Sequence, residues 1–79
     1  MATTNLEKYI DTREGIADAR LLRTGAHIWA LIGYYRAVKK DSSQLARDYH
    51  LQPDEVEAVL TFYREHKAAI DARLLLNSA

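Results

Sequence analysis

An apolar stripe at helical spacing runs through the last third of the chain and constrains the fold most. Its positions recur at helical spacing and are apolar except at Lys67: Val56, Val59, Leu60, Tyr63, Lys67, Ile70 and Leu74. Pro53 suits the first turn of a helix, where its missing amide proton would be unpaired in any case. No glycine or proline follows it before Asn77. The pattern therefore predicts one long helix over residues 53–76.

Two shorter helices are predicted upstream of this stripe. Apolar residues at helical spacing predict a helix over residues 28–39, with lysines at its carboxyl end, where cations complement the helix dipole. Asp41 is followed three residues later by Gln44, as in a capping box, which predicts a short helix over residues 43–49.

Residues 5–27 form a less regular arm. Tyr9–Thr12 and Arg20–Thr24 are each typical of a short strand, and a turn near Gly15 would separate them. Residues 17–22 also suit a helical turn. The arm is predicted as a β and loop element ahead of the helices.

The segment 44–60 has the layout of a helix-turn-helix. Ala46 supplies a small residue where the two helices would cross, and His50 stands at the turn position that requires a positive φ. The predicted fold is mainly α: a three-helix, homeodomain-like helix-turn-helix bundle with a short N-terminal β element and a long C-terminal helix, in one domain over residues 1–79. The alternative for this segment is an αα corner that only builds a core.

Length and composition limit the protein's surroundings. A chain of 79 residues without cysteine buries a small core and gains no disulfide, so a homodimer is expected. The lack of cysteine favours a reducing compartment, and we expect a cytoplasmic protein. The sequence has neither a signal peptide pattern nor an apolar run that would span a membrane, so no membrane partner is expected.

The net charge of zero hides an asymmetry. Residues 1–40 carry seven basic and four acidic residues, a net +3, and residues 41–79 carry four basic and seven acidic residues, a net −3. Any phosphate-binding surface is therefore expected in the first half. The candidate DNA-binding residues are Arg13, Arg20 and Arg23 in the arm and Gln52 at the start of the predicted recognition helix. Ordinary solvated surface is an equally weighted alternative for the arginines.

The predicted recognition helix itself argues against a reader of DNA grooves. Its exposed start carries Asp54, Glu55 and Glu57, and carboxylates repel phosphates. DNA binding is therefore the weaker expectation for this helix.

Catalytic and metal-binding patterns are missing from the sequence. His27, His50 and His66 lie far apart and show no ligand spacing. Thr24 has no recognisable general base near it in sequence. We expect no catalytic residue, no metal ion and no cofactor, and the chain is not predicted to be an enzyme.

Three consecutive leucines close the last predicted helix. Neighbouring residues of a helix do not share a face, so at least one of these leucines should be exposed unless another chain covers it. We expect a dimer or a heteromer that uses this end. The candidate contact residues are Tyr63, Ile70, Leu74, Leu75 and Leu76.

Residues 23–36, RTGAHIWALIGYYR, resemble the "GTGIxVW" segment of the bacterial domain-of-unknown-function family 433. The similarity continues through residues 43–49, 51–56 and 58–63, then His66 and residues 70–72. This resemblance implies a homeodomain-like helix-turn-helix after a short β element, and a VapB-type antitoxin encoded beside a PIN-like ribonuclease toxin. The chain departs from the family pattern within residues 23–27.

The sequence and the resemblance together predict an antitoxin-like binding protein. It would neutralise the ribonuclease toxin by protein contact, with its acidic, leucine-ended C-terminal helix as the inhibitory surface and with operator binding as an added role. The alternative is a stand-alone helix-turn-helix regulator that binds DNA.

Overall fold

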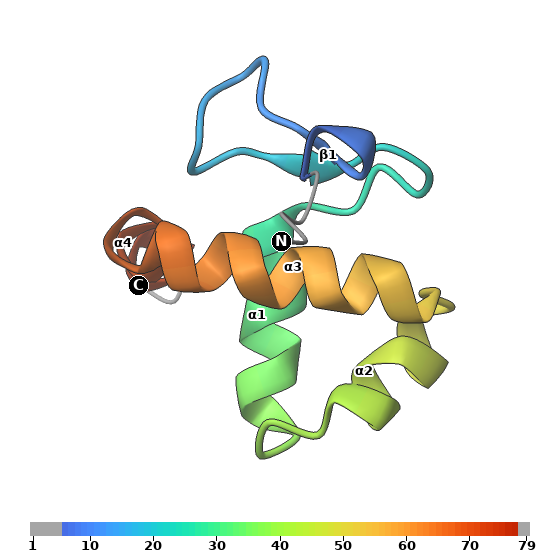
Figure 1. The fold of residues 1–79 in the computed structure, drawn as a ribbon. Coiled ribbons are helices and arrows are strands. Elements are labelled where there is room, and N and C mark those ends of the chain that lie inside the picture. Colours follow the sequence, from blue (N-terminus) through green and yellow to red (C-terminus); the bar gives the residue numbers. More distant parts are fainter. Residues whose placement is uncertain (1–5, 78–79) are drawn as a thin grey trace.

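The computed structural model describes residues 6–77, which are mainly helical and include one small sheet (Figure 1). The elements in chain order are a 3-10 turn η1 (Leu6–Lys8), strands β1 (Ile10–Asp11) and β2 (Arg20–Leu21), and helices α1 (Ile28–Ala37), α2 (Ser42–Tyr49), α3 (Pro53–Glu65) and α4 (Lys67–Asn77). Residue 5, the first of the predicted arm, lies outside the described residues.

The arm contains the predicted β element in shortened form. The two strands pair antiparallel, with Ile10 opposite Leu21, and both side chains are buried against the helices. Gly15 has a φ of 103° in the turn between the strands, a conformation that favours glycine. Residues 20–21 are strand, so the helical alternative for residues 17–22 is wrong at its end.

Helix α1 is the central helix and contacts each of the other three helices. Ile28, Leu31 and Ile32 on its inner face are fully buried. The helix ends at Ala37, two residues before the predicted end. The Lys39 N–H donates to the carbonyl of Arg36, and the backbone turns left-handed at this lysine.

Local sequence signals predict both ends of α2 to within one residue, and they predict the start of α3. The Asp41 carboxylate accepts a hydrogen bond from the Gln44 N–H, and α2 begins at Ser42, one residue earlier than predicted. His50 ends α2 in the left-handed conformation, with a φ of 56°. The prediction of a positive φ at this turn is confirmed. Pro53 begins α3, also as predicted.

The prediction of one helix over residues 53–76 is wrong, because the chain turns a corner at His66. This residue ends α3 by donating its N–H to the carbonyls of Phe62 and Tyr63, and its own carbonyl accepts from the Ile70 N–H in the first turn of α4. In Figure 1, α3 runs across α1, whereas α4 is seen nearly end-on beside them. The apolar stripe keeps its spacing through the corner, so periodicity alone could not reveal it.

Helix α4 packs back on α1 through small and apolar residues. Ile70 is fully buried, and a β-carbon added at Gly33 would lie only 3.0 Å from Leu74 Cδ2. The Arg73 guanidinium lies 4.8 Å from the centre of the Trp29 ring and donates to Asp18 in the arm at 3.2 Å. Through these contacts α4 packs as part of the core and does not extend away from the body of the protein.

Candidate binding surfaces

The arm arginines that were candidates for DNA binding are engaged by carboxylates. Arg13 makes a bidentate contact with Asp11, with Nη2 at 2.8 Å from Oδ2 and Nε at 3.0 Å from Oδ1. These hydrogen bonds, together with one from the Arg13 N–H, lower the pKa of Asp11 to about 2. Arg20 approaches Glu14 at 3.5 Å.

The residues that line the hollow at this hairpin have a net negative charge. It has a volume of about 140 Å³ and is lined by Asp11, Arg13, Glu14, Asp18 and Arg20, three acids against two bases. A surface that grips phosphates needs an excess of cations, because affinity comes from the counterions that they displace. The local charge of the arm therefore does not favour nucleic acid.

Arg23 and Gln52 meet on one buried carboxylate. The Arg23 guanidinium donates to both oxygens of Glu55, at 2.8 and 2.6 Å, and to the His50 carbonyl at 2.7 Å. The Gln52 N–H donates to the same carboxylate at 2.9 Å. The Glu55 side chain is only 5% exposed. The hydrogen bonds from Arg23, followed by that from Gln52, lower the pKa of Glu55 below its ordinary value against the opposing effect of burial.

This cluster gives Arg23 a role in the fold. The arginine joins the arm to the turn before α3, and it makes its charge-assisted hydrogen bonds to groups of the same chain. Asp54 in the same first turn accepts from the Tyr9 hydroxyl at 3.2 Å. The start of α3 thus presents two carboxylates that bind the arm, and the expectation that Glu55 lies on an exposed start of this helix is wrong. Gln52 takes part in this cluster through its backbone N–H.

The five candidate partner contacts separate into buried and exposed residues. Ile70 is fully buried inside the chain, so its proposed role in partner contact is wrong: α4 folds back and covers it. Tyr63 and Leu74 are partly buried, and the Tyr63 hydroxyl donates to Asp71 at 2.7 Å. Leu75 and Leu76 are 73% and 74% exposed. The prediction that at least one terminal leucine is exposed is confirmed.

The corner at His66 also separates the acidic residues from the leucines. The predicted inhibitory surface placed both on one acidic, leucine-ended helix. Asp54, Glu55 and Glu57 lie on α3, whereas α4 carries Lys67 and Arg73 against a single acid. The helix that presents the leucines is therefore basic, and the prediction of an acidic leucine-ended surface is wrong.

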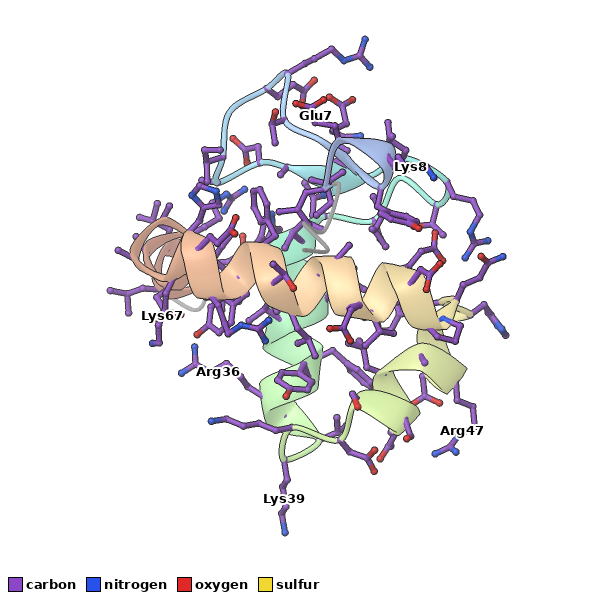
Figure 2. All side chains as sticks on the ribbon, in the orientation of Figure 1. Glu7, Lys8, Arg36, Lys39, Arg47 and Lys67 are labelled. Atoms are coloured by element: carbon purple, nitrogen blue, oxygen red, sulfur yellow. The ribbon has the colours of Figure 1, made fainter. Side chains whose placement is uncertain are left out.

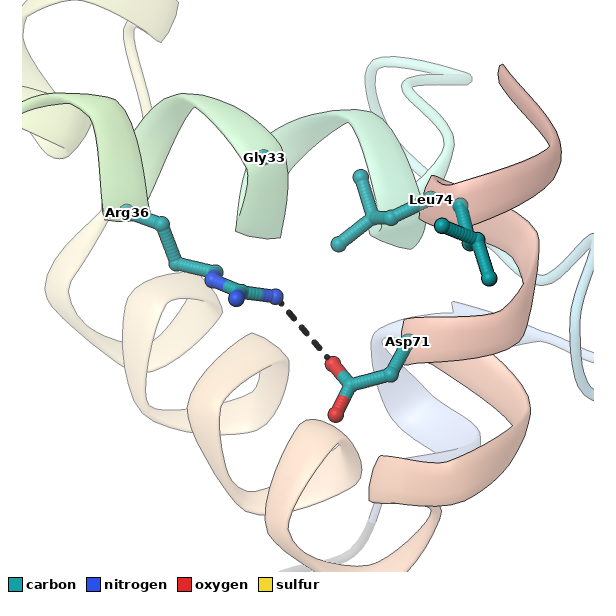
Figure 3. Close-up of a pocket in the computed structure, with 5 residues that line it drawn as sticks. Gly33, Arg36, Asp71 and Leu74 are labelled. Carbon is teal, nitrogen blue, oxygen red and sulfur yellow. Dashed lines mark hydrogen bonds and ion pairs between the residues drawn. The ribbon is translucent and has the colours of Figure 1, made fainter. Parts of the chain in front are cut away.

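A groove between α1 and α4 lies beside these leucines (Figure 3). It has a volume of about 460 Å³ and is lined by Gly33, Arg36, Asp71, Leu74 and Leu75. The side chains of Arg36 and Asp71 point towards one another across it, with Nη1 at 3.3 Å from Oδ1.

Asp71 is the centre of the polar side of this groove. Its carboxylate accepts from Lys67 Nζ at 2.8 Å, from the Tyr63 hydroxyl and from Arg36. The bonds from Lys67 and Tyr63 do most to lower the pKa of Asp71. The bond between Lys67 and Asp71 also raises the pKa of Lys67. Asp71 and Lys67 therefore stay charged around neutral pH. With Lys67 beside it, the polar side of the groove has two cations for one anion.

Sequence reasoning missed the groove, although one signal for it was present. Lys67 and Asp71 are four residues apart, a spacing at which opposite charges pair on a helix. Arg36 and Gly33 come from a distant helix, and no local pattern reports that α4 packs against them.

Residues 6–77 contain no group of three or more His, Cys, Asp or Glu side chains placed to hold a metal ion. None of the helices within that range combines the length and apolar character needed to cross a membrane. Comparison of the chain with models of protein families, with curated proteins and with solved structures found no match.

Proposed function

We propose that this protein is an antitoxin-like binding protein that acts by protein contact through the carboxyl end of α4. The observation that carries the proposal is the exposure of Leu76 and Leu75 at the end of a helix whose other large apolar side chains, Ile70 and Leu74, pack against the core. Covering one exposed leucine stabilises a complex by about 1.5–3 kcal/mol. A partner that covers this end therefore gains a substantial contact from two adjacent side chains.

Leu75 and Leu76 are the most exposed of the large apolar side chains in residues 6–77. Val56, Val59 and Ile70 of the apolar stripe are buried, and Leu74 packs against the core. From the sequence, the stripe from Val56 to Leu74 is expected to be longer than a 79-residue body can cover, and so to need a second chain. That expectation is wrong, because the chain covers the stripe itself. The proposal rests on the leucines that follow it.

The resemblance described above indicates which partner to test first. It implies a PIN-like ribonuclease, and an antitoxin would silence that enzyme by occupying its surface. A homodimer through the same leucines is the simplest arrangement of the protein before it meets the toxin, because a two-fold contact brings identical patches together.

The direct test is capture of the product of the neighbouring open reading frame by the immobilised protein. Leu76→Glu should abolish capture, because a charge at the contact cannot be buried without a partner. Leu22→Glu is the matched control, since Leu22 is also exposed, at 53%, but lies on the arm. If both variants lose capture equally, or if neither loses it, the leucine end is not the contact surface. Light scattering on the protein alone reports whether Leu76→Glu also dissociates a homodimer into monomers.

The second candidate is a homeodomain-like regulator that binds DNA without a toxin. Its support is the geometry of α2 and α3, which meet at a left-handed His50 and are braced by α1, as a helix-turn-helix requires. The engaged arm arginines and the acidic start of α3 count against it. Salt-dependent retention on the DNA upstream of the gene is the measurement that would favour it.

A further inference from the structure

The groove between α1 and α4 has two chemically different sides. Leu74 and Leu75 from α4, together with the bare backbone at Gly33 of α1, form an apolar side. Arg36 and Asp71 form the polar side, as Figure 3 shows. A cleft of this kind, largely apolar with a few polar groups, fixes both the identity and the orientation of what enters it.

Arg36 has hydrogen-bonding capacity that the fold does not use. A guanidinium carries five N–H donors, and within residues 6–77 this one makes a single hydrogen bond, at 3.3 Å, to Asp71. Asp71 already accepts shorter bonds from Tyr63 and Lys67. Arg36 is also half-exposed. By contrast, Arg13 and Arg23 are held by bidentate bonds to their carboxylates.

The charge around the groove is net positive. Arg36 and Lys67 oppose the single carboxylate of Asp71, and Figure 2 shows both cations on the same side of the molecule. Lys39 and Lys40 follow at the end of α1, and neither forms an ion pair within residues 6–77. The resulting positive potential attracts acidic groups and speeds their encounter with this surface.

We propose that this groove binds a short acidic segment of a partner protein, an inference that rests on the proposed function. An apolar side chain of that segment would pack against Leu74 and Leu75, and a neighbouring carboxylate would bind the unused edge of the Arg36 guanidinium. Paired N–H donors match the two oxygens of a carboxylate, so this contact selects for Asp or Glu beside the apolar residue. Phosphate along a nucleic acid would find the charge but nothing for the apolar side.

The test uses the full chain and a fluorescein-labelled peptide, Gly-Glu-Leu-Leu-Glu-Gly, followed by anisotropy. Two matched peptides carry Gln in place of Glu, or Ser in place of Leu. The parent peptide should bind about tenfold more tightly than either, because each replacement removes one of the two contacts. Equal binding of the three peptides, or no binding of the parent, would overturn the proposal.

Two variants that each lose one positive charge separate a local contact from general attraction. Arg36→Gln should weaken peptide binding about tenfold. Arg47→Gln should leave binding nearly unchanged, because Arg47 lies on α2, at the other side of the molecule in Figure 2. An equal effect of the two variants would mean that only net charge matters, and would refute the groove as the site.

Chemical-shift mapping of the peptide complex gives an independent readout. Perturbed amides should cluster at Gly33, Arg36 and Asp71, whereas perturbations confined to the arm would contradict the assignment. Failure of the peptide with continued loss of partner capture by Leu76→Glu would leave the proposed function standing and refute only the groove. Peptide binding with no partner capture would support the groove as a binding site and refute the proposed function.

Discussion

Replacement of Ile70 by alanine tests whether α4 is a wall of the core. Ile70 is fully buried between α4 and the rest of the chain, so truncation removes its buried methyl and methylene groups and leaves a cavity. Such changes cost about 2–5 kcal/mol, and we expect about 3 kcal/mol for Ile70→Ala. In a domain of this size the melting temperature should then fall by about 12–24 °C.

The matched control lies on the same helix. Leu76 is 74% exposed, so Leu76→Ala should change the free energy of unfolding by less than about 0.5 kcal/mol. Urea unfolding followed by circular dichroism measures both variants, with an unchanged slope as the check on two-state behaviour. Equal stability of Ile70→Ala and Leu76→Ala would refute the reasoning, since a helix that projects away from the body would tolerate both.

Three further predictions concern the arm and the helix ends. Because the folded pKa of Glu55 lies below its ordinary value of 4.5, the carboxylate's contribution is full above pH 4.5 and is lost as the pH falls through the folded value; Glu55→Gln should flatten this acid branch in thermal melts. Arg23→Met should lower the melting temperature more than Arg13→Met, because only the first leaves a buried carboxylate without its arginine; equal melting temperatures would contradict this. Lys39→Gly should raise the free energy of unfolding by about 0.5–1 kcal/mol in urea titrations, since glycine relieves the left-handed strain at a φ of 58°; a loss of stability would show that the lysine side chain contributes more than its backbone costs.

Features that depend on a few neighbouring residues were predictable from the sequence. The cap at Asp41, the start at Pro53 and the left-handed turn at His50 each follow from the chemistry of one residue type at one position. The short β element was also predictable, because strand-forming residues flank a glycine that suits the turn.

Features that depend on distant partners were not predictable. The corner at His66 leaves the apolar spacing intact and uses no glycine or proline, so nothing local marks it. Arg23 reads equally well as a phosphate ligand or as half of an ion pair until Glu55 is placed beside it. The groove likewise needs Gly33 and Asp71 to be neighbours in space, which only the docking of α4 decides.

The hydrogen bonds that His66 itself gives to the corner come from its backbone, and this affects where the molecule tolerates variation. Its N–H and carbonyl serve the end of α3 and the start of α4, while its imidazole packs on the Phe62 ring, with centres 4.6 Å apart, at a hollow beside the arm. Other side chains can therefore occupy position 66 without redirecting the last helix. Substitution at Gly33 has a more direct effect on the groove, because a β-carbon there would lie 3.0 Å from Leu74 Cδ2 and the leucine side chain would have to shift. Related chains that share this binding surface should accordingly vary at the corner and keep a glycine in the middle of α1.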